Sequence, residues 1–195
     1  MADPAIIRLF VAIELPGSVL SALTQLQHQL QRNPAIARLR WVRPEGIHLT
    51  LKFLGETPAD RQPAIEAAIA KAASGQASFE LGLGRLGSFG SKQSPRVLWV
   101  DLTGDAQRLA QLQTRVEAEL ASAGFPPDSR RFSPHLTLAR VPPDRAREVA
   151  SPLAEAIAST AIPSVTFPAD AVSLMKSDLR PGGAIYTRLF ESPLR

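Results

Sequence analysis

The tetrapeptide HLTL occurs twice in this chain, at residues 48–51 and at residues 135–138. The chain has only three histidines, so two of them stand in identical surroundings, each two residues before a threonine. Histidine titrates near neutral pH, so one ring of such a pair can hold a proton while the other is neutral. Two rings in these states can serve one reaction as general acid and general base. The repeat therefore predicts acid–base chemistry shared between His48 and His135.

The spacing within each motif predicts which side chains share a face. In a strand, His48 and Thr50 point one way while the leucines that follow them point to the core, and His135 and Thr137 repeat this arrangement. Threonine hydroxyls can donate to phosphoryl oxygens that gain charge in a transition state. The two motifs thus favour phosphoryl chemistry with no nucleophilic side chain and no metal. The alternative is that both histidines are structural residues of ordinary strands.

The segments around the motifs predict two passes through the same order of elements. The two histidines are 87 residues apart, and a shift of 87 places RLFVAIEL (8–15) over PRVLWVDL (95–102) without a gap. We expect an internal duplication with approximate two-fold symmetry, and a chance likeness of two α/β stretches is the alternative. Periodicity and breaker residues predict strands at 8–15, 47–55, 78–86, 95–102, 132–141, 164–176 and 184–190, and helices at 18–32, 59–73, 105–122 and 142–158.

The repeat also predicts the domain organisation. We expect a single domain over residues 1–195, made of two pseudo-symmetric lobes that cover about 1–90 and 91–195. The stretch SFGSKQSP (88–95) is rich in turn residues and is predicted to be the loop between the lobes. GLGRLG (82–87) matches a dinucleotide-binding pattern, but no helix can begin after it, so we interpret these glycines as part of a close-packed strand.

The composition limits the classes of function. With 45% hydrophobic and 21% charged residues, the chain has the composition of an ordinary globular protein. Cysteine is absent, which excludes disulfides, thiol catalysis and cysteine-bound zinc. No apolar run is long enough to span a membrane, and we expect a cytoplasmic protein. The net charge is +4 and 18 of the 22 basic residues are arginine, which suits a polyanionic partner or reflects a coding bias.

Longer phrases around the motifs resemble one known family. RLFVAIELP, RPEGIHLTLKFLGE, PRVLWV, RRFSPHLTLARV and SDLRPGGAIYTRL together are similar to the bacterial and archaeal RNA 2′,3′-cyclic phosphodiesterases, formerly called 2′-5′ RNA ligases, of the 2H phosphoesterase superfamily. The likeness runs from about residue 7 to residue 190. It implies an α+β fold with a bilobal internal duplication, in which two antiparallel sheets line a central basic cleft and helices pack outside.

The resemblance also implies an activity and the roles of particular residues. The expected reaction is hydrolysis of an RNA terminal 2′,3′-cyclic phosphate to a 2′-phosphate without metal or other cofactor. Carried over, His48 is the proton donor and His135 the proton acceptor, while Thr50 and Thr137 hold the phosphate. Arg130 occupies the place of a family arginine and is expected to contact the substrate phosphate, with a solvated turn residue as the alternative.

Four further features are assigned from strand alternation and residue type. Lys52 is predicted on the same face as His48, where its charge is optional. Arg140 is predicted on the opposite face from His135, with a structural role. Tyr186 is interpreted as a core tyrosine, with base stacking as the alternative. The segment ARLRWVR (37–43) is either a basic and aromatic RNA-binding patch or a lobe surface.

Other functions remain open at the level of sequence. We expect RNA ends or nucleotides with a 2′,3′-cyclic phosphate as partners, no membrane, and a monomer. Reverse 2′-5′ ligation follows from microscopic reversibility. The chain is alternatively a non-catalytic nucleotide- or RNA-phosphate-binding module, or a phosphodiesterase for another cyclic or 2′-5′-linked nucleotide.

Overall fold

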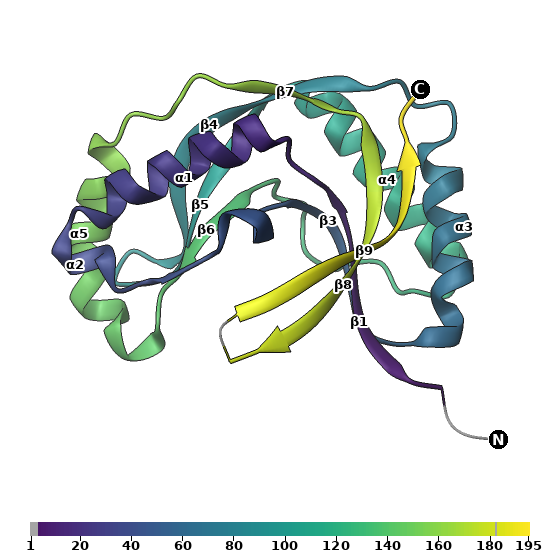
Figure 1. Cartoon of the computed structure of the whole chain (residues 1–195), viewed down its shortest axis with the longest axis horizontal. Coiled ribbons are helices and arrows are strands. Elements are labelled where there is room, and N and C mark those ends of the chain that lie inside the picture. Colours follow the sequence, from purple (N-terminus) through teal and green to yellow (C-terminus); the bar gives the residue numbers. More distant parts are fainter. Residues whose placement is uncertain (1–3, 182) are drawn as a thin grey trace.

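The strands of the chain form a single antiparallel sheet with helices packed on its outer side (Figure 1). The computed structural model describes residues 4–181 and 183–195. In that part of the chain the sheet order is β7-β4-β5-β6-β3-β1-β8-β9, and β2 pairs with β6. The strands are β1 (Ile6–Ile13), β2 (Arg40–Trp41), β3 (Leu49–Pro58), β4 (Phe79–Ser91), β5 (Ser94–Gly104), β6 (Leu136–Arg140), β7 (Thr166–Ala169), β8 (Ala171–Arg180) and β9 (Gly183–Pro193).

The helices form two groups, one over each half of the sheet (Figure 1). Over one half α5 packs against β4 and β5, with α2 beside it and α1 next to α2. Over the other half α3 packs against β8 and β9, and α4 packs against α3 and β3. The helices are α1 (Gly17–Gln31), α2 (Pro34–Ala37), α3 (Gln62–Ala73), α4 (Ala106–Ser122) and α5 (Ala146–Ser159), with short 3-10 turns η1 (Pro44–Gly46), η2 (Ala59–Arg61) and η3 (Pro143–Arg145).

The backbone register confirms the duplication predicted from the sequence. Every pair that β5 makes with β6 has a counterpart 87 residues earlier between β1 and β3. A β-bulge follows Val11 in β1 and another follows its counterpart Leu98 in β5. The corresponding pairs are Phe10–Phe53 and Val97–Arg140, Val11–Lys52 and Leu98–Ala139, Ala12–Thr50 and Trp99–Thr137, and Ile13–Leu49 and Val100–Leu136. The predicted α+β class, with antiparallel strands and outer helices, is also confirmed, but in the described residues the two expected sheets are joined into one through the β3–β6 pair.

The two copies meet in the middle of the sheet. Within the described residues, β3 and β6 pair at one position, Leu49 with Leu136, and these two leucines are equivalent in the repeat. The third strand of each copy then lies beside the first strand of the other copy, because β4 pairs with β5 and β8 pairs with β1. Each half of the sheet therefore contains strands from both copies of the repeat. The lobe boundary near residue 90 stays a prediction about the sequence repeat.

One predicted loop is wrong. Residues 88–95 are predicted to separate the lobes, but β4 continues to Ser91 and β5 begins at Ser94, which leaves a tight hairpin. Strand pairing overrides the turn-forming residues here, because Gly90 adopts a positive φ of 110° and closes against the backbone of Ser94.

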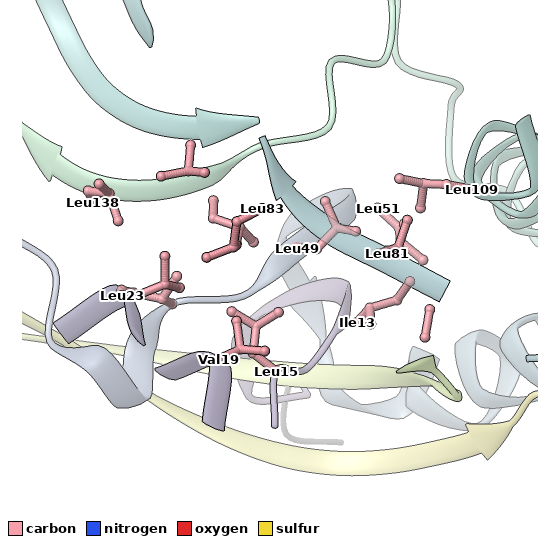
Figure 2. Close-up of a cluster of buried hydrophobic side chains, with 14 of the residues drawn as sticks. Ile13, Leu15, Val19, Leu23, Leu49, Leu51, Leu81, Leu83, Leu109 and Leu138 are labelled. Carbon is pink, nitrogen blue, oxygen red and sulfur yellow. The ribbon is translucent and has the colours of Figure 1, made fainter. Parts of the chain in front are cut away.

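The main core lies between the sheet and the helices, and it contains the leucines of both motifs. Leu49, Leu51, Leu136 and Leu138 are all buried. Figure 2 shows Leu49 and Leu51 of β3 among side chains from β4, α1 and α4. The leucines thus fix both motif strands to the core, and the alternating polar residues point away from it.

Candidate active site

Both histidines lie next to the position where the two copies meet. His48 and His135 are the residues immediately before Leu49 and Leu136, the one pair that joins β3 to β6 in the described residues. Both rings are half-buried, as are the threonines that follow them. The predicted alternation is thus confirmed within each tetrapeptide, with leucines in the core and polar side chains on the other face.

Backbone hydrogen bonds give the two rings the same orientation. The Nδ1–H of His48 donates to the carbonyl oxygen of Gly46 at 2.9 Å, and the Nδ1–H of His135 donates to that of Ser133 at 2.7 Å. A carbonyl can only accept, so each ring carries its proton on Nδ1 when it is neutral. The Nε2 atoms are left with lone pairs. In each copy, Nε2 is therefore the nitrogen that can accept or deliver a proton.

Aromatic side chains hold the His48 ring. Phe10 stacks on it with ring centroids 4.5 Å apart, and Tyr186 meets its plane edge-on at 5.0 Å. Phe10 and Tyr186 belong with Ala12 and Met175 to a small apolar cluster that is separate from the main core. This cluster fixes the ring in place and removes part of its contact with water.

A different aromatic pair flanks His135. Phe89 approaches this ring edge-on at 4.8 Å and packs against Trp99 at 5.2 Å. Trp99 lies opposite Thr137 in the β5–β6 register and covers Gly87, where an added Cβ would stand 2.2 Å from the indole. The last glycine of GLGRLG is therefore required by this close packing between β4 and β5, and its interpretation as part of a close-packed strand is confirmed.

Burial and neighbouring charges set the proton affinities of the two rings. Burial lowers the pKa of His48 to about 4, the Glu14 carboxylate opposes this shift, and a charge on His135 adds to it. Burial also lowers the pKa of His135, and the Arg140 guanidinium lowers it further. The His48 ring is thus close enough to His135 to respond to charge on it. The lowered pKa of each ring favours its neutral form.

A groove of about 860 Å³ opens on the side of His48. Its floor and walls come from both copies and from the β8–β9 hairpin. Five arginines and one carboxylate line it, so the groove is strongly basic. The charged residues are Arg8, Arg40, Arg43, Arg140, Arg180 and Glu45, and the site residues among the remainder are Phe10, His48, Thr50 and Tyr186.

The two β-bulges move Lys52 and Arg140 away from the faces predicted for them. Each bulge lets two residues oppose one on the partner strand, so alternation slips after the motif. Lys52, predicted beside His48, is instead 4% exposed and bonds Glu117 at 2.6 Å on the core side. Arg140, predicted to face away from His135, lines the groove. Phe53, the counterpart of Arg140, also lines it.

The other predicted site residues are placed less centrally. His135 and Thr137 lie on the neighbouring strand and are not part of the groove lining in the described residues. Arg130 is exposed in the segment before β6 and does not line the groove in that part of the chain. Tyr186, interpreted as a core residue, lines the groove beside His48. The roles of the histidines, threonines and Arg130 stay predictions.

A buried glutamine connects the segment before the first motif to the strand of the second motif. The Gln27 amide of α1 donates to the carbonyl of Val42, before the first motif, at 2.8 Å, and to that of Leu138, in the second, at 3.0 Å. Since Gln27 is 4% exposed, these bonds are shielded from water. No sequence signal points to this role, because a glutamine in LTQLQHQLQ looks like a surface residue.

Neither a metal-binding cluster nor a membrane-spanning helix occurs among residues 4–181 and 183–195. No three His, Asp or Glu side chains gather there as a metal site would require. No helix in those residues combines the length and apolar character needed to cross a bilayer.

Comparison with known proteins identifies the relatives of the chain. The family described as the 2′-5′ RNA ligase superfamily matches residues 23–181. The protein named RNA 2′,3′-cyclic phosphodiesterase from Methanothermobacter thermautotrophicus is 30% identical, over 93% of this chain and 95% of its own length. A crystal structure from Thermus thermophilus is similar with a TM-score of 0.77 and 29% identity, covering 97% and 98% of the two chains. E. coli LigT complexed with 3′-AMP has a TM-score of 0.71 and 26% identity, over 99% of both chains.

Proposed function

The chain belongs to the 2′-5′ RNA ligase superfamily, and from this premise we propose that it hydrolyses the 2′,3′-cyclic phosphate at RNA ends to a 2′-phosphate. The observation that carries the proposal is the repeated presentation of two imidazoles. Both have a lone pair on Nε2 and stand beside the single β3–β6 pair of the described residues. Curated relatives named RNA 2′,3′-cyclic phosphodiesterase support the choice of substrate.

In the proposed reaction the two rings act on opposite sides of one phosphorus atom. The Nε2 of His135 accepts a proton from water as its oxygen attacks phosphorus. The bond between phosphorus and the 3′ oxygen breaks, and Nε2–H of His48 protonates the leaving oxygen. The hydroxyls of Thr50 and Thr137 donate to the non-bridging oxygens. The same sequence with a 5′-hydroxyl in place of water forms a 2′-5′ bond and releases the 3′ oxygen; this ligation is the reverse of 2′-5′ bond cleavage, as microscopic reversibility requires.

The charges beside the rings support this division of roles. The Glu14 carboxylate raises the pKa of His48, which favours the protonated form needed by an acid. The Arg140 guanidinium lowers the pKa of His135, which favours the neutral form needed by a base. Burial outweighs Glu14 in the free protein, so the anionic phosphate must raise the pKa of His48 when it binds. Arg140 also lines the groove and is the better-placed cation for that phosphate, whereas Arg130 stays a proposal from the family alone.

The test uses an RNA oligonucleotide with a 2′,3′-cyclic end and identifies the product. We expect a 2′-phosphate, turnover that survives EDTA, and a loss of at least ~10²-fold in kcat for His48→Ala and for His135→Ala. His28→Ala is the matched control, because His28 is the remaining histidine and is exposed on α1. Tight RNA binding without turnover would favour the binding module instead. Loss of activity on chelation, with rescue by a divalent ion, would contradict the metal-free mechanism.

A further inference from the structure

The groove beside His48 exposes an unusual number of apolar side chains. In the described residues four large hydrophobic side chains are exposed, and three of them, Phe53 at 46%, Leu179 at 68% and Ile185 at 49%, line this groove. The fourth, Ile6, does not. Scattered surface hydrophobics need no explanation, whereas a group inside one hollow indicates a binding surface. The chemistry at His48 and Thr50 does not use them.

The charges around these side chains indicate what kind of ligand they bind. Five arginines line the groove, and none of them forms a salt bridge among the described residues. Unpaired guanidinium groups recognise phosphates, and Glu45 is the one carboxylate that the described residues contribute to the lining. Apolar surface together with free cations matches single-stranded nucleic acid, which offers flat bases and a charged backbone.

Phe53 is built as a platform for a flat ligand. The Arg8 guanidinium lies over its ring at 4.7 Å from the centroid, which fixes the ring and adds positive charge beside it. The β-bulge in the β1–β3 pair turns Phe53 to the groove face, and the equivalent bulge turns Arg140 to the same face. The duplicated position therefore holds an aromatic ring in the first copy and a cation in the second. The ring of Phe53 can stack on a base, and the guanidinium of Arg140 can bind a phosphate.

The β8–β9 hairpin supplies the remaining wall. β8 pairs with β1 from Ser173 to Lys176, and past that point the described residues of the hairpin pair with each other (Figure 1). Figure 1 shows this outer part projecting away from β1. It carries Leu179, Ile185 and Tyr186 along the groove. The groove is thus long enough to continue beyond the histidine along the hairpin.

We propose that this groove binds the unpaired bases that precede the terminal nucleotide, with Phe53 as the stacking platform. The inference rests on the proposed function and names its substrate class, which is the single-stranded 3′ end of an oligonucleotide rather than a free cyclic mononucleotide. The volume of about 860 Å³ lies near the upper end of the ~300–1,000 Å³ typical of small-ligand sites, which leaves room beyond one nucleotide.

Three substrates test the inference by their kcat/KM. They are a 2′,3′-cyclic mononucleotide, a trinucleotide with the same cyclic end, and that trinucleotide with an abasic residue next to the terminal nucleotide. The wild-type protein should prefer the intact trinucleotide, and removal of the base should cost about tenfold, as stacked bases do. Phe53→Ala should lose the same factor on the intact trinucleotide and lose nothing more on the abasic one. Phe53→Leu, which keeps apolar bulk without a π face, should resemble Phe53→Ala.

Ile6→Ala is the matched control, because it removes the exposed large apolar side chain that lies outside the groove, and it should leave all three rates unchanged. Equal rates for the mononucleotide and the trinucleotide would overturn the inference and leave the proposed function standing. The inference would also be overturned if Phe53→Ala lowered kcat/KM by the same factor on the abasic trinucleotide as on the intact one. Phe53 would then not contact the base that the abasic residue lacks. If no cyclic phosphate is hydrolysed in any substrate, the proposed function itself is wrong.

Discussion

The burial of His48 predicts that acid weakens the fold through this one side chain. Burial lowers its pKa from 6.5 to about 4 in the folded protein, whereas the unfolded chain keeps the ordinary value. Between these values the unfolded state binds a proton at this position that the folded state does not bind. Stability contributed above pH 6.5 is therefore lost as the pH falls toward 4. A pKa difference of this size corresponds to about 3 kcal/mol, which is an upper bound for a ring that is partly exposed.

The variant His48→Asn isolates this effect. Its side-chain amide can still donate to the carbonyl of Gly46, but it does not titrate. Urea unfolding of both proteins, followed by circular dichroism from neutral pH to about pH 4, gives the free energy of unfolding at each pH. The wild-type protein should lose about 2–3 kcal/mol more than the variant over that range. His135 titrates in both proteins, so its own contribution cancels in the difference apart from its coupling to His48.

The refuting result is a difference between the two proteins that stays constant with pH. It would mean that the His48 ring titrates alike in the folded and unfolded states. An NMR titration of the ring Cε1 proton provides an independent measurement, and a midpoint near the ordinary histidine value of about 6.5 in the folded protein would contradict the argument from burial. Neither measurement depends on the substrate, so both test the site before its chemistry is known.

Three other changes probe the surroundings of the site. Lys52→Met leaves the Glu117 carboxylate without its buried partner and should cost about 3 kcal/mol in the free energy of unfolding, whereas Lys52→Met with Glu117→Leu should recover most of it. Arg140→Gln removes a positive charge and should raise the pKa of His135, measured as a higher midpoint of its ring resonance; an unchanged midpoint would contradict this coupling. Gly87→Ala forces a methyl group into the indole that covers it and should cost about 1–3 kcal/mol in thermal unfolding.

Local pattern was enough to predict the repeat and the faces of the two tetrapeptides. The alternation of histidine and threonine with leucine places Leu49 and Leu136 in the core, as the structure confirms. The 87-residue shift predicted the strand equivalence, and the register confirms it pair by pair. These features depend on neighbours within a few residues, which a sequence displays directly.

The positions after each bulge could not be predicted in the same way. Each of these bulges adds one residue to its strand, and neither contains a glycine or proline that would mark it in the sequence. Simple alternation therefore placed Lys52 and Arg140 on the wrong faces. The exchange of third strands between copies was equally hidden, because pairing between distant segments leaves no local periodicity. The basic groove depends on both features. The sequence therefore shows the arginines of the groove, but it does not predict that they line the same groove.

β4 of the first copy pairs with the second copy, and β8 of the second copy pairs with the first, which decides whether either copy could fold alone. Either copy alone would leave the first strand without the neighbour that flanks it in the sheet. Two identical copies could complete each other only as a symmetric pair that trades these strands, with the symmetry axis passing between Leu49 and Leu136. A chain that contains both copies no longer has to keep them identical. Phe53 and Arg140 occupy matching places with unlike chemistry, so one molecule can distinguish the two ends of an asymmetric ligand.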